Sequence, residues 1–228
     1  AAELLQSRPG IVLTGMGSSF FISLAAQYCA QRMGVRTLAV DTGELCHDMR
    51  SWLQDATLVI VSRSGESAEI VRLLATAREA HCPIIAITNA PDSSLGRAAD
   101  LILDVHADFD HNVSVKMYNG PLQTAILVLV RAAGGDPGTL LEPLRRGWTQ
   151  VAERLEGWEQ ALEEVAPLFR GAVTQYYLGR GVGYASACEG RLLCEEASKY
   201  PATADNAGAF RHGSIEVVNE AFRGVLFL

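Results

Sequence analysis

Short apolar runs that alternate with helix-length segments dominate the first half of the sequence. The runs cover residues 10–15, 35–40, 56–62, 83–90 and 100–105. They are continuously apolar instead of alternating with polar residues, which is typical of parallel strands that are covered on both faces. The segments between them, at 18–34, 43–53 and 66–82, have the length or the caps of helices. The sequence therefore predicts an α/β fold with a parallel sheet.

This pattern begins again late in the chain. Gly15-Met16-Gly17 and Gly179-Arg180-Gly181 each follow an apolar run directly and open a helical segment, which indicates an internal repeat. Ser62 lies 45 residues after Gly17, and the same distance from Gly181 ends in the last apolar run, 224–228. We therefore expect the second unit to stop at its third strand, as an incomplete part of a longer chain.

Punctuation and composition suggest where the units divide. Residues 134–138, Gly-Gly-Asp-Pro-Gly, are the clearest break in the pattern. We expect a first domain over 1–135, a linker of two helices over 136–170 and a truncated second domain over 171–228. The apolar segment 119–133 predicts a helix that packs between the two units.

Charge and composition exclude several classes of protein. The 228 residues carry a net charge of −7, which argues against a partner made of nucleic acid. No apolar run approaches the ~20 residues of a membrane span, and the first ten residues lack the features of a secretory signal. The five cysteines contain no CxxC pair, so we expect reduced thiols, no metal site and a cytoplasmic location.

Two serine-rich stretches follow predicted strands. The first contains Ser18 and Ser19, and the second, Ser-Arg-Ser-Gly-Glu-Ser, spans 62–67. Both open helices at the carboxyl edge of the expected sheet, where free N–H groups and the helix dipole favour anions. One such stretch is explained by ordinary helix capping, which needs no ligand. Two stretches at one edge favour a cradle for a phosphate or a phosphosugar.

A nucleotide site is a weaker interpretation of the same residues. The chain contains no G-x-x-x-x-G-K-[ST] sequence, and Gly-Met-Gly-Ser-Ser-Phe departs from G-x-G-x-x-G at its last glycine.

A set of motifs resembles the SIS (sugar isomerase) family in order and spacing. They are GMGSS (15–19), SRSGES (62–67), NVSVK (112–116), GRG (179–181), CEGRLLCEEASK (188–199) and FRHG (210–213). The arrangement is most similar to the two-domain isomerase half of glucosamine-6-phosphate synthase and to fructosamine-6-phosphate deglycases. The resemblance implies two SIS-type units, each a flavodoxin-like, doubly wound, five-stranded parallel sheet flanked by helices.

The resemblance also implies roles for individual residues. The sugar phosphate would be bound by Ser18, Ser19, Ser62, Ser64, Gly65 and Ser67, and Ser114 would line the sugar pocket. Glu196 matches the glutamate that moves a proton between C1 and C2, a task that suits a desolvated carboxylate. His212 matches a histidine that assists ring opening and reaches the neighbouring subunit's site. Without the motif, Glu196 and Lys199 would be a solvated i,i+3 pair.

Three positions depart from the family pattern. Leu193 stands where the synthase has a lysine, Ala209 where many relatives have a glutamate, and Ser214 where proline is usual. Leu193 argues against the complete glutamine-dependent synthase reaction.

The expected function is that of a phosphosugar isomerase acting on an amino-sugar or fructosamine 6-phosphate. It would need no cofactor, and its homodimer would share a site between subunits. The alternatives are a fructosamine-6-phosphate deglycase and a sugar-phosphate-binding module or sensor without catalysis. Glu196 discriminates between them, because a binder needs only the serines.

Overall fold

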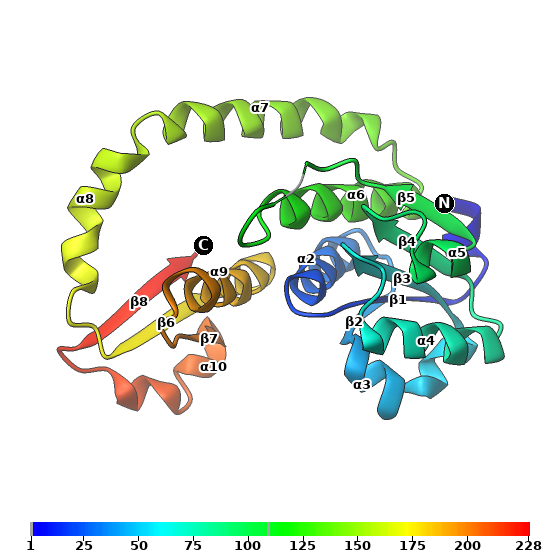
Figure 1. The fold of residues 1–228 in the computed structure, drawn as a ribbon, viewed down its shortest axis with the longest axis horizontal. Helices are drawn as coiled ribbons and strands as arrows, with labels where there is room; N and C mark the ends of the chain where they lie inside the picture. The colour runs from blue at the N-terminus through cyan, green and yellow to red at the C-terminus, as the bar shows by residue number, and fades with distance from the viewer. Residues whose placement is uncertain (1, 109) are drawn as a thin grey trace.

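Two parallel sheets organise the computed structural model, which describes residues 2–108 and 110–228 (Figure 1). The first has the order β2-β1-β3-β4-β5 and the second the order β7-β6-β8. The strands of the first sheet are β1 (Gly10–Gly15), β2 (Thr37–Asp41), β3 (Ala56–Ser62), β4 (Ile84–Thr88) and β5 (Leu101–Asp104). Those of the second are β6 (Thr174–Gly179), β7 (Thr203–Asn206) and β8 (Phe222–Phe227). Every described pair is parallel, which confirms the predicted α/β class.

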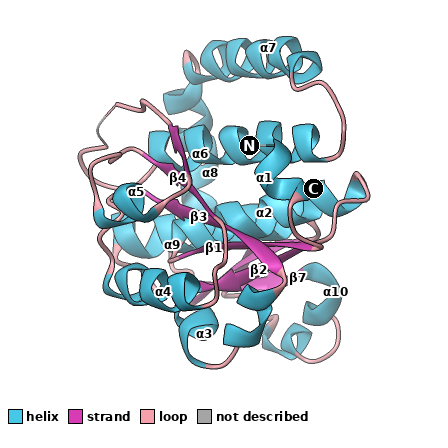
Figure 2. Cartoon of the chain, turned by 90° about the vertical axis from the view of Figure 1, so that its right-hand side faces the viewer, coloured by secondary structure: helices cyan, strands magenta, loops and turns pink. Residues whose placement is uncertain are grey.

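Helices cover both faces of the first sheet. They are α1 (Ala2–Gln6), α2 (Ser18–Arg32), α3 (Thr42–His47), α4 (Ala68–Glu79), α5 (Ser94–Ala98), α6 (Lys116–Ala132) and the 3₁₀ helix η1 (Arg50–Gln54). Leu58 and Ile60 of β3 pack with α3 and α4, whereas Val59 and Val61 pack with α2 and α6. Figure 2 shows the strands between these two layers. All seven residues of β3 are buried, which explains its continuously apolar sequence.

The short helices differ from the sequence-based expectation. The helix predicted over 43–53 is two pieces, α3 and η1, with a break at Asp48 and Met49. Helix α5 was not predicted, because its five residues are too few to show a period. It is fixed by a cap, in which the Ser93 hydroxyl accepts a hydrogen bond from Gly96 N at 3.2 Å.

Strand β2 forms one edge of the first sheet, and two glutamines of α2 cover its outward backbone groups. The Ala39 N–H donates to Gln27 Oε1. The Gln31 amide donates to the Thr37 carbonyl oxygen at 3.2 Å. Because an open edge invites pairing with another strand, these side chains protect the sheet.

Two helices, α7 (Gly138–Leu155) and α8 (Trp158–Phe169), connect the sheets in an arc (Figure 1). They form the predicted helical pair, and neither buries a residue. Large apolar side chains are exposed along both helices, at Leu141, Trp148, Val151, Leu155, Trp158, Leu162, Val165 and Leu168. No described helix combines the length and the apolar composition needed to cross a membrane.

The second unit contains α9 (Val182–Ser198), α10 (Ala207–Phe210) and the 3₁₀ helix η2 (Ser214–Val217) beside its sheet. Helix α9 packs against α2 of the first unit (Figure 1). The Arg191 guanidinium lies 5.9 Å from the centre of the Phe21 ring. The contact between units is therefore made by α2, whereas the helix expected there, α6, packs on α1, α2 and β4.

The two glycine turns of the repeat have the same backbone geometry. Gly17 has φ 52° and ψ −125°, and Gly181 has φ 57° and ψ −127°. Both torsion pairs lie where residues with a Cβ rarely occur, which accounts for glycine in both copies.

Candidate functional site

The strand order creates a switch point between β1 and β3. The chain leaves β1 through α2 to reach β2 on one side, and leaves β3 through α4 to reach β4 on the other. In open parallel sheets, ligands bind outside the carboxyl ends of the strands at such a point. Ser18 and Ser19 begin α2 directly after β1, and residues 62–67 join β3 to α4. The structure thus brings both serine stretches to one sheet edge.

Hydrogen bonds within residues 62–67 shape the second serine stretch. The Ser62 hydroxyl accepts from Gly65 N at 3.0 Å, and the Ser64 hydroxyl accepts from Glu66 N at 3.3 Å. Ser62 is buried, whereas Ser64 is exposed and Ser67 is half-buried. Each of these two bonds uses a lone pair of the serine oxygen, so both hydroxyl protons stay available to a ligand.

The same stretch is held against the loop before α5. Gly65 has φ 63°, and a Cβ there would lie 2.7 Å from Ser93 Cβ and 3.1 Å from Leu95 Cβ. Leu95 N donates to the Gly65 carbonyl at 3.2 Å, and Ser94 N donates to Glu66 Oε1 at 2.6 Å. The Ser94 hydrogen bond lowers the pKa of the Glu66 carboxyl. Glu66 therefore fixes the shape of the loop.

Ordinary capping does not explain the serine hydroxyls. Ser67 occupies the N-cap position of α4, yet its side chain makes no capping hydrogen bond. The N-cap of α2 is Gly17, so Ser18 and Ser19 lie in the first turn of that helix. This observation favours the anion-binding interpretation over the alternative of capping.

The loop that contains Ser114 is anchored by a buried aspartate. Asp110 accepts hydrogen bonds from the backbone N–H groups of Val115, Lys116 and Met117 at 3.0–3.2 Å. Burial opposes ionisation of Asp110, but the three N–H groups prevail and hold its pKa below the ordinary value. An ionised Asp110 thus caps α6 and positions residues 111–115 beside the second unit.

Glu196 lies on α9, where it lines a cavity of 710 Å³ between the units. The cavity is lined by His111, Asn112, Val113, Glu196, Ala197 and Lys199. Glu196 is exposed, and Lys199 donates to its backbone oxygen. The structure therefore brings Glu196 beside the loop of Ser114. His111 was not predicted as a site residue, because nothing in its sequence context marks it.

His212 lies outside that cavity in the single chain. It follows α10, is exposed and donates its backbone N–H to the Ala209 carbonyl at 2.8 Å. The serine stretches are likewise not among the residues that line the cavity.

Glu189 is a charged residue of this region that the sequence analysis did not single out. It is 5% exposed, and Ser18 Oγ donates to its Oε1 atom at 3.1 Å. Its spacing could have revealed it, since it shares a face of α9 with the buried Ala185 and Cys188. Its partner Ser18 is 171 residues away and is known only from the fold.

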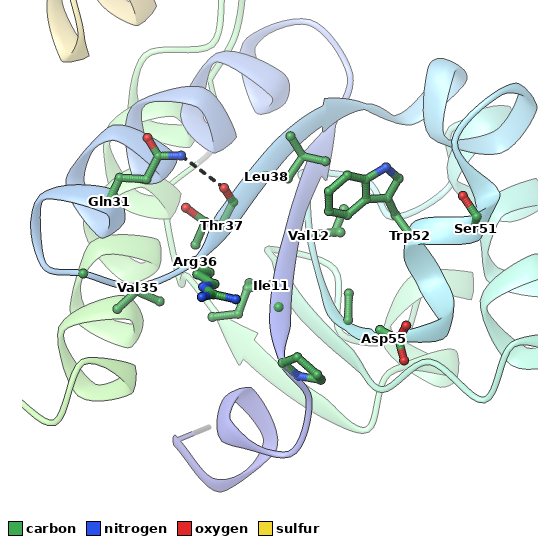
Figure 3. A pocket seen from close by; sticks show the side chains of 14 residues that line it. Ile11, Val12, Gln31, Val35, Arg36, Thr37, Leu38, Ser51, Trp52 and Asp55 are labelled. Atoms are coloured by element: carbon green, nitrogen blue, oxygen red, sulfur yellow. Dashed lines mark hydrogen bonds between the residues drawn. The ribbon is translucent and has the colours of Figure 1, made fainter.

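A second cavity lies at the opposite end of the strands. It measures 780 Å³ and is lined by the first residues of β1, β2 and β3 together with Trp52. The Trp52 ring faces Val12 and Leu38 (Figure 3). Because ligands of parallel sheets bind at the carboxyl ends, this cavity is separate from the candidate site. Among the described residues, no three His, Cys, Asp or Glu side chains are grouped as metal ligands.

The fold and its serine-lined edge define a doubly wound α/β protein with an anion-binding switch point. Within that class the sequence profile of the SIS domain matches residues 3–132, more than half of the chain. The protein belongs to the SIS domain family.

Curated relatives extend the similarity over nearly the whole chain. It is 30% identical over 234 residues to the glutamine–fructose-6-phosphate aminotransferase [isomerizing] of Aeropyrum pernix, with 98% of this chain covered. It is 27% identical over 225 residues to the enzyme of that name from Pyrococcus horikoshii, with 96% covered. The chain spans 38% of the length of each of these relatives.

Solved structures share the fold. The C-terminal domain of glucosamine-fructose-6-phosphate aminotransferase from Francisella tularensis matches 99% of this chain, and 66% of that domain is covered. The TM-score is 0.87 at 22% identity. Tagatose-6-phosphate ketose/aldose isomerase from Escherichia coli has a TM-score of 0.76 at 23% identity, with 98% of this chain and 64% of that chain covered. These likenesses support the predicted SIS-type architecture.

Proposed function

We propose that the protein is a phosphosugar isomerase of the aldose–ketose type that acts on an amino-sugar or fructosamine 6-phosphate. The observation that carries the proposal is the placement of Glu196 across a cavity from the 111–113 loop, on the side of the sheet where the serines end β1 and β3. SIS family membership and the names of the relatives support a phosphosugar as the ligand.

The serine edge binds the phosphate in this proposal. Hydroxyls of Ser62, Ser64 and Ser67 and free N–H groups at the starts of α2 and α4 surround the anion without adding positive charge. Ser19 contributes from the first turn of α2, and Gly65 allows the backbone to approach closely. Ser114 lines the sugar from the loop that Asp110 holds.

Glu196 carries the chemical step. Its carboxylate removes the proton from the carbon next to the sugar carbonyl, and the C–H electron pair forms a carbon–carbon double bond while the carbonyl oxygen takes a proton. The resulting enediol then accepts the proton from Glu196 on the adjacent carbon, which completes the exchange of aldehyde and ketone. The substrate carbonyl supplies the acidity, so the step needs no cofactor. His212 assists opening of the sugar ring from a neighbouring subunit, which makes the active unit a homodimer.

Two other functions fit parts of the same site. A fructosamine-6-phosphate deglycase would use the same proton transfer and release an amine. A binding module would use only the serine edge, and one observation favours it: Glu196 is exposed and has the apolar Leu193 three residues before it.

One experiment separates these functions. Fructose 6-phosphate, glucose 6-phosphate and a fructosamine 6-phosphate are added singly in deuterated water. Heats of binding and exchange of the C1 and C2 protons are recorded by calorimetry and NMR. We expect binding with exchange in the wild type, and binding with exchange reduced by about 10³-fold or more in Glu196→Gln. Glu195→Gln, on the same helix but outside the cavity, is the matched control.

Each alternative has its own outcome. Exchange that persists in Glu196→Gln would remove Glu196 from its role as the base. Binding without exchange in the wild type would leave the binding module, and release of an amine would identify the deglycase.

A further inference from the structure

A buried carboxyl group joins the two units directly beneath the serine edge. Glu189 of α9 is 5% exposed, and its Oε1 accepts the Ser18 hydroxyl of α2 at 3.1 Å. Its Oε2 is buried and has no hydrogen-bond partner among the described residues. A carboxylate in this position would keep a negative charge with one hydrogen bond, which is costly inside a protein.

The groups around Glu189 do not compensate such a charge. Burial raises its pKa to about 7, and the Glu196 carboxylate on the same helix adds to the rise. The Ser18 hydroxyl and the Arg191 guanidinium act in the opposite direction. Arg191 is already paired with Glu195 at 2.5 Å and lies over the Phe21 ring.

Two further titratable groups face the same region. Tyr118 approaches from α6, and Cys188 is the neighbour of Glu189 on α9. Both are neutral in their ordinary states, so neither offsets a negative charge on Glu189.

We propose that Glu189 is a positioning residue of the phosphosugar site, which in its neutral acid form holds Ser18 and thereby fixes the start of α2 against α9. The inference rests on the proposed function, because it concerns the same bound phosphate. Ser18 gives its hydroxyl proton to Glu189 and so presents only lone pairs and its backbone N–H to a ligand. The phosphate must then be bound mainly by the stretch from Ser62 to Ser67.

Ionisation of Glu189 would weaken that binding. It places a second anion behind the turn that receives the phosphate, in an interior where charge is poorly screened. Binding should therefore weaken as the pH rises through the range in which Glu189 loses its proton. A glutamine in its place keeps an acceptor for Ser18 and cannot ionise.

The test measures the dissociation constant of fructose 6-phosphate by calorimetry between about pH 6.5 and pH 8.5 for the wild type, Glu189→Gln and Glu189→Ala. A phosphate monoester has a second pKa of about 6, so it is largely dianionic over this range. We expect the wild type to lose about tenfold in affinity across the range and Glu189→Gln to lose little. Glu189→Ala should bind several-fold more weakly at every pH, because Ser18 loses its acceptor.

A purely structural role for Glu189 would lower affinity without changing the pH profile. Identical profiles for the wild type and Glu189→Gln would overturn the proposal, because all other titratable groups are common to both proteins. Failure of the wild type to bind fructose 6-phosphate at any pH would instead contradict the proposed function.

A second variant keeps the test decisive if Glu189→Gln does not fold. Ser18→Ala removes the hydrogen bond that lowers the pKa of Glu189. The midpoint of the pH profile should then move to higher pH. An unmoved midpoint in Ser18→Ala would overturn the proposal.

Discussion

At the scale of single residues, Glu189 makes the stability of the fold depend on pH. Its pKa rises from 4.5 to about 7 on folding, so the folded protein binds a proton that the unfolded chain releases. Stability from this group is complete below about pH 4.5, declines as the pH rises to about 7, and changes little above that value. Glu189→Gln should remove this dependence.

Urea unfolding of both proteins at about pH 5 and pH 8 checks this prediction. The difference in unfolding free energy between Glu189→Gln and the wild type should move in favour of the variant by roughly 2–3 kcal/mol between the two conditions. A difference that stays constant would show that Glu189 ionises equally in the folded and unfolded chains.

Gly65 tests the shape of the serine loop. Gly65→Ala introduces a Cβ at φ 63° that collides with Ser93, so we expect a loss of more than 1 kcal/mol in stability together with loss of phosphosugar affinity. Gly34→Ala is the matched control, because Gly34 has φ 76° and open space around it. It should cost only about 1 kcal/mol in thermal unfolding and leave binding unchanged. Equal effects of the two substitutions would contradict the close packing of Gly65.

At the scale of elements, the edge strand β2 depends on two side chains of α2. Gln27→Ala with Gln31→Ala uncovers the Ala39 N–H and the Thr37 carbonyl. We expect a loss of about 1 kcal/mol for each hydrogen bond and self-association that grows with protein concentration. Light scattering across a dilution series measures it, with Gln150→Ala on the exposed face of α7 as the control. A double variant that scatters like this control would show that the edge needs no cover.

The elements also show how far sequence patterns reach. The strand predicted over 56–62 is β3, because a strand buried on both faces must be apolar throughout. Strand β7, Thr203–Asn206, was not predicted, since its half-exposed sequence TADN has no apolar period. Its place follows from pairing with β6, a contact between distant segments that no local pattern encodes.

At the scale of the whole molecule, the site draws on both units, and the proposed dimer adds a third source. Motifs located the serine edge and Glu196, because backbone N–H groups and hydroxyls at strand ends recur in sequence. They could not locate Glu189 or His111, whose surroundings come from contacts between α2, α9 and the 111–113 loop.

A mixing experiment tests whether His212 acts across a subunit boundary. Glu196→Gln and His212→Ala should each be inactive alone. Dimers formed from both would contain one intact site, so an equal mixture should recover roughly a quarter of wild-type turnover after subunit exchange. Glu196→Gln mixed with itself is the control, and size measurements by light scattering report the dimer. No recovery from exchanged dimers would place His212 in its own subunit's site or outside the reaction.

The repeated glycine turn has a consequence for the history of the chain. The second copy keeps the backbone of Gly179 and Gly181 but has Val182 and Gly183 where the first has Ser18 and Ser19. A duplicated half that retains the bend and discards the hydroxyls is no longer under selection to grip an anion. Its helix became free to acquire Glu189 and Glu196 and to turn them toward its twin. The two halves divided one ancestral task, with one as the holder and the other as the source of acid and base.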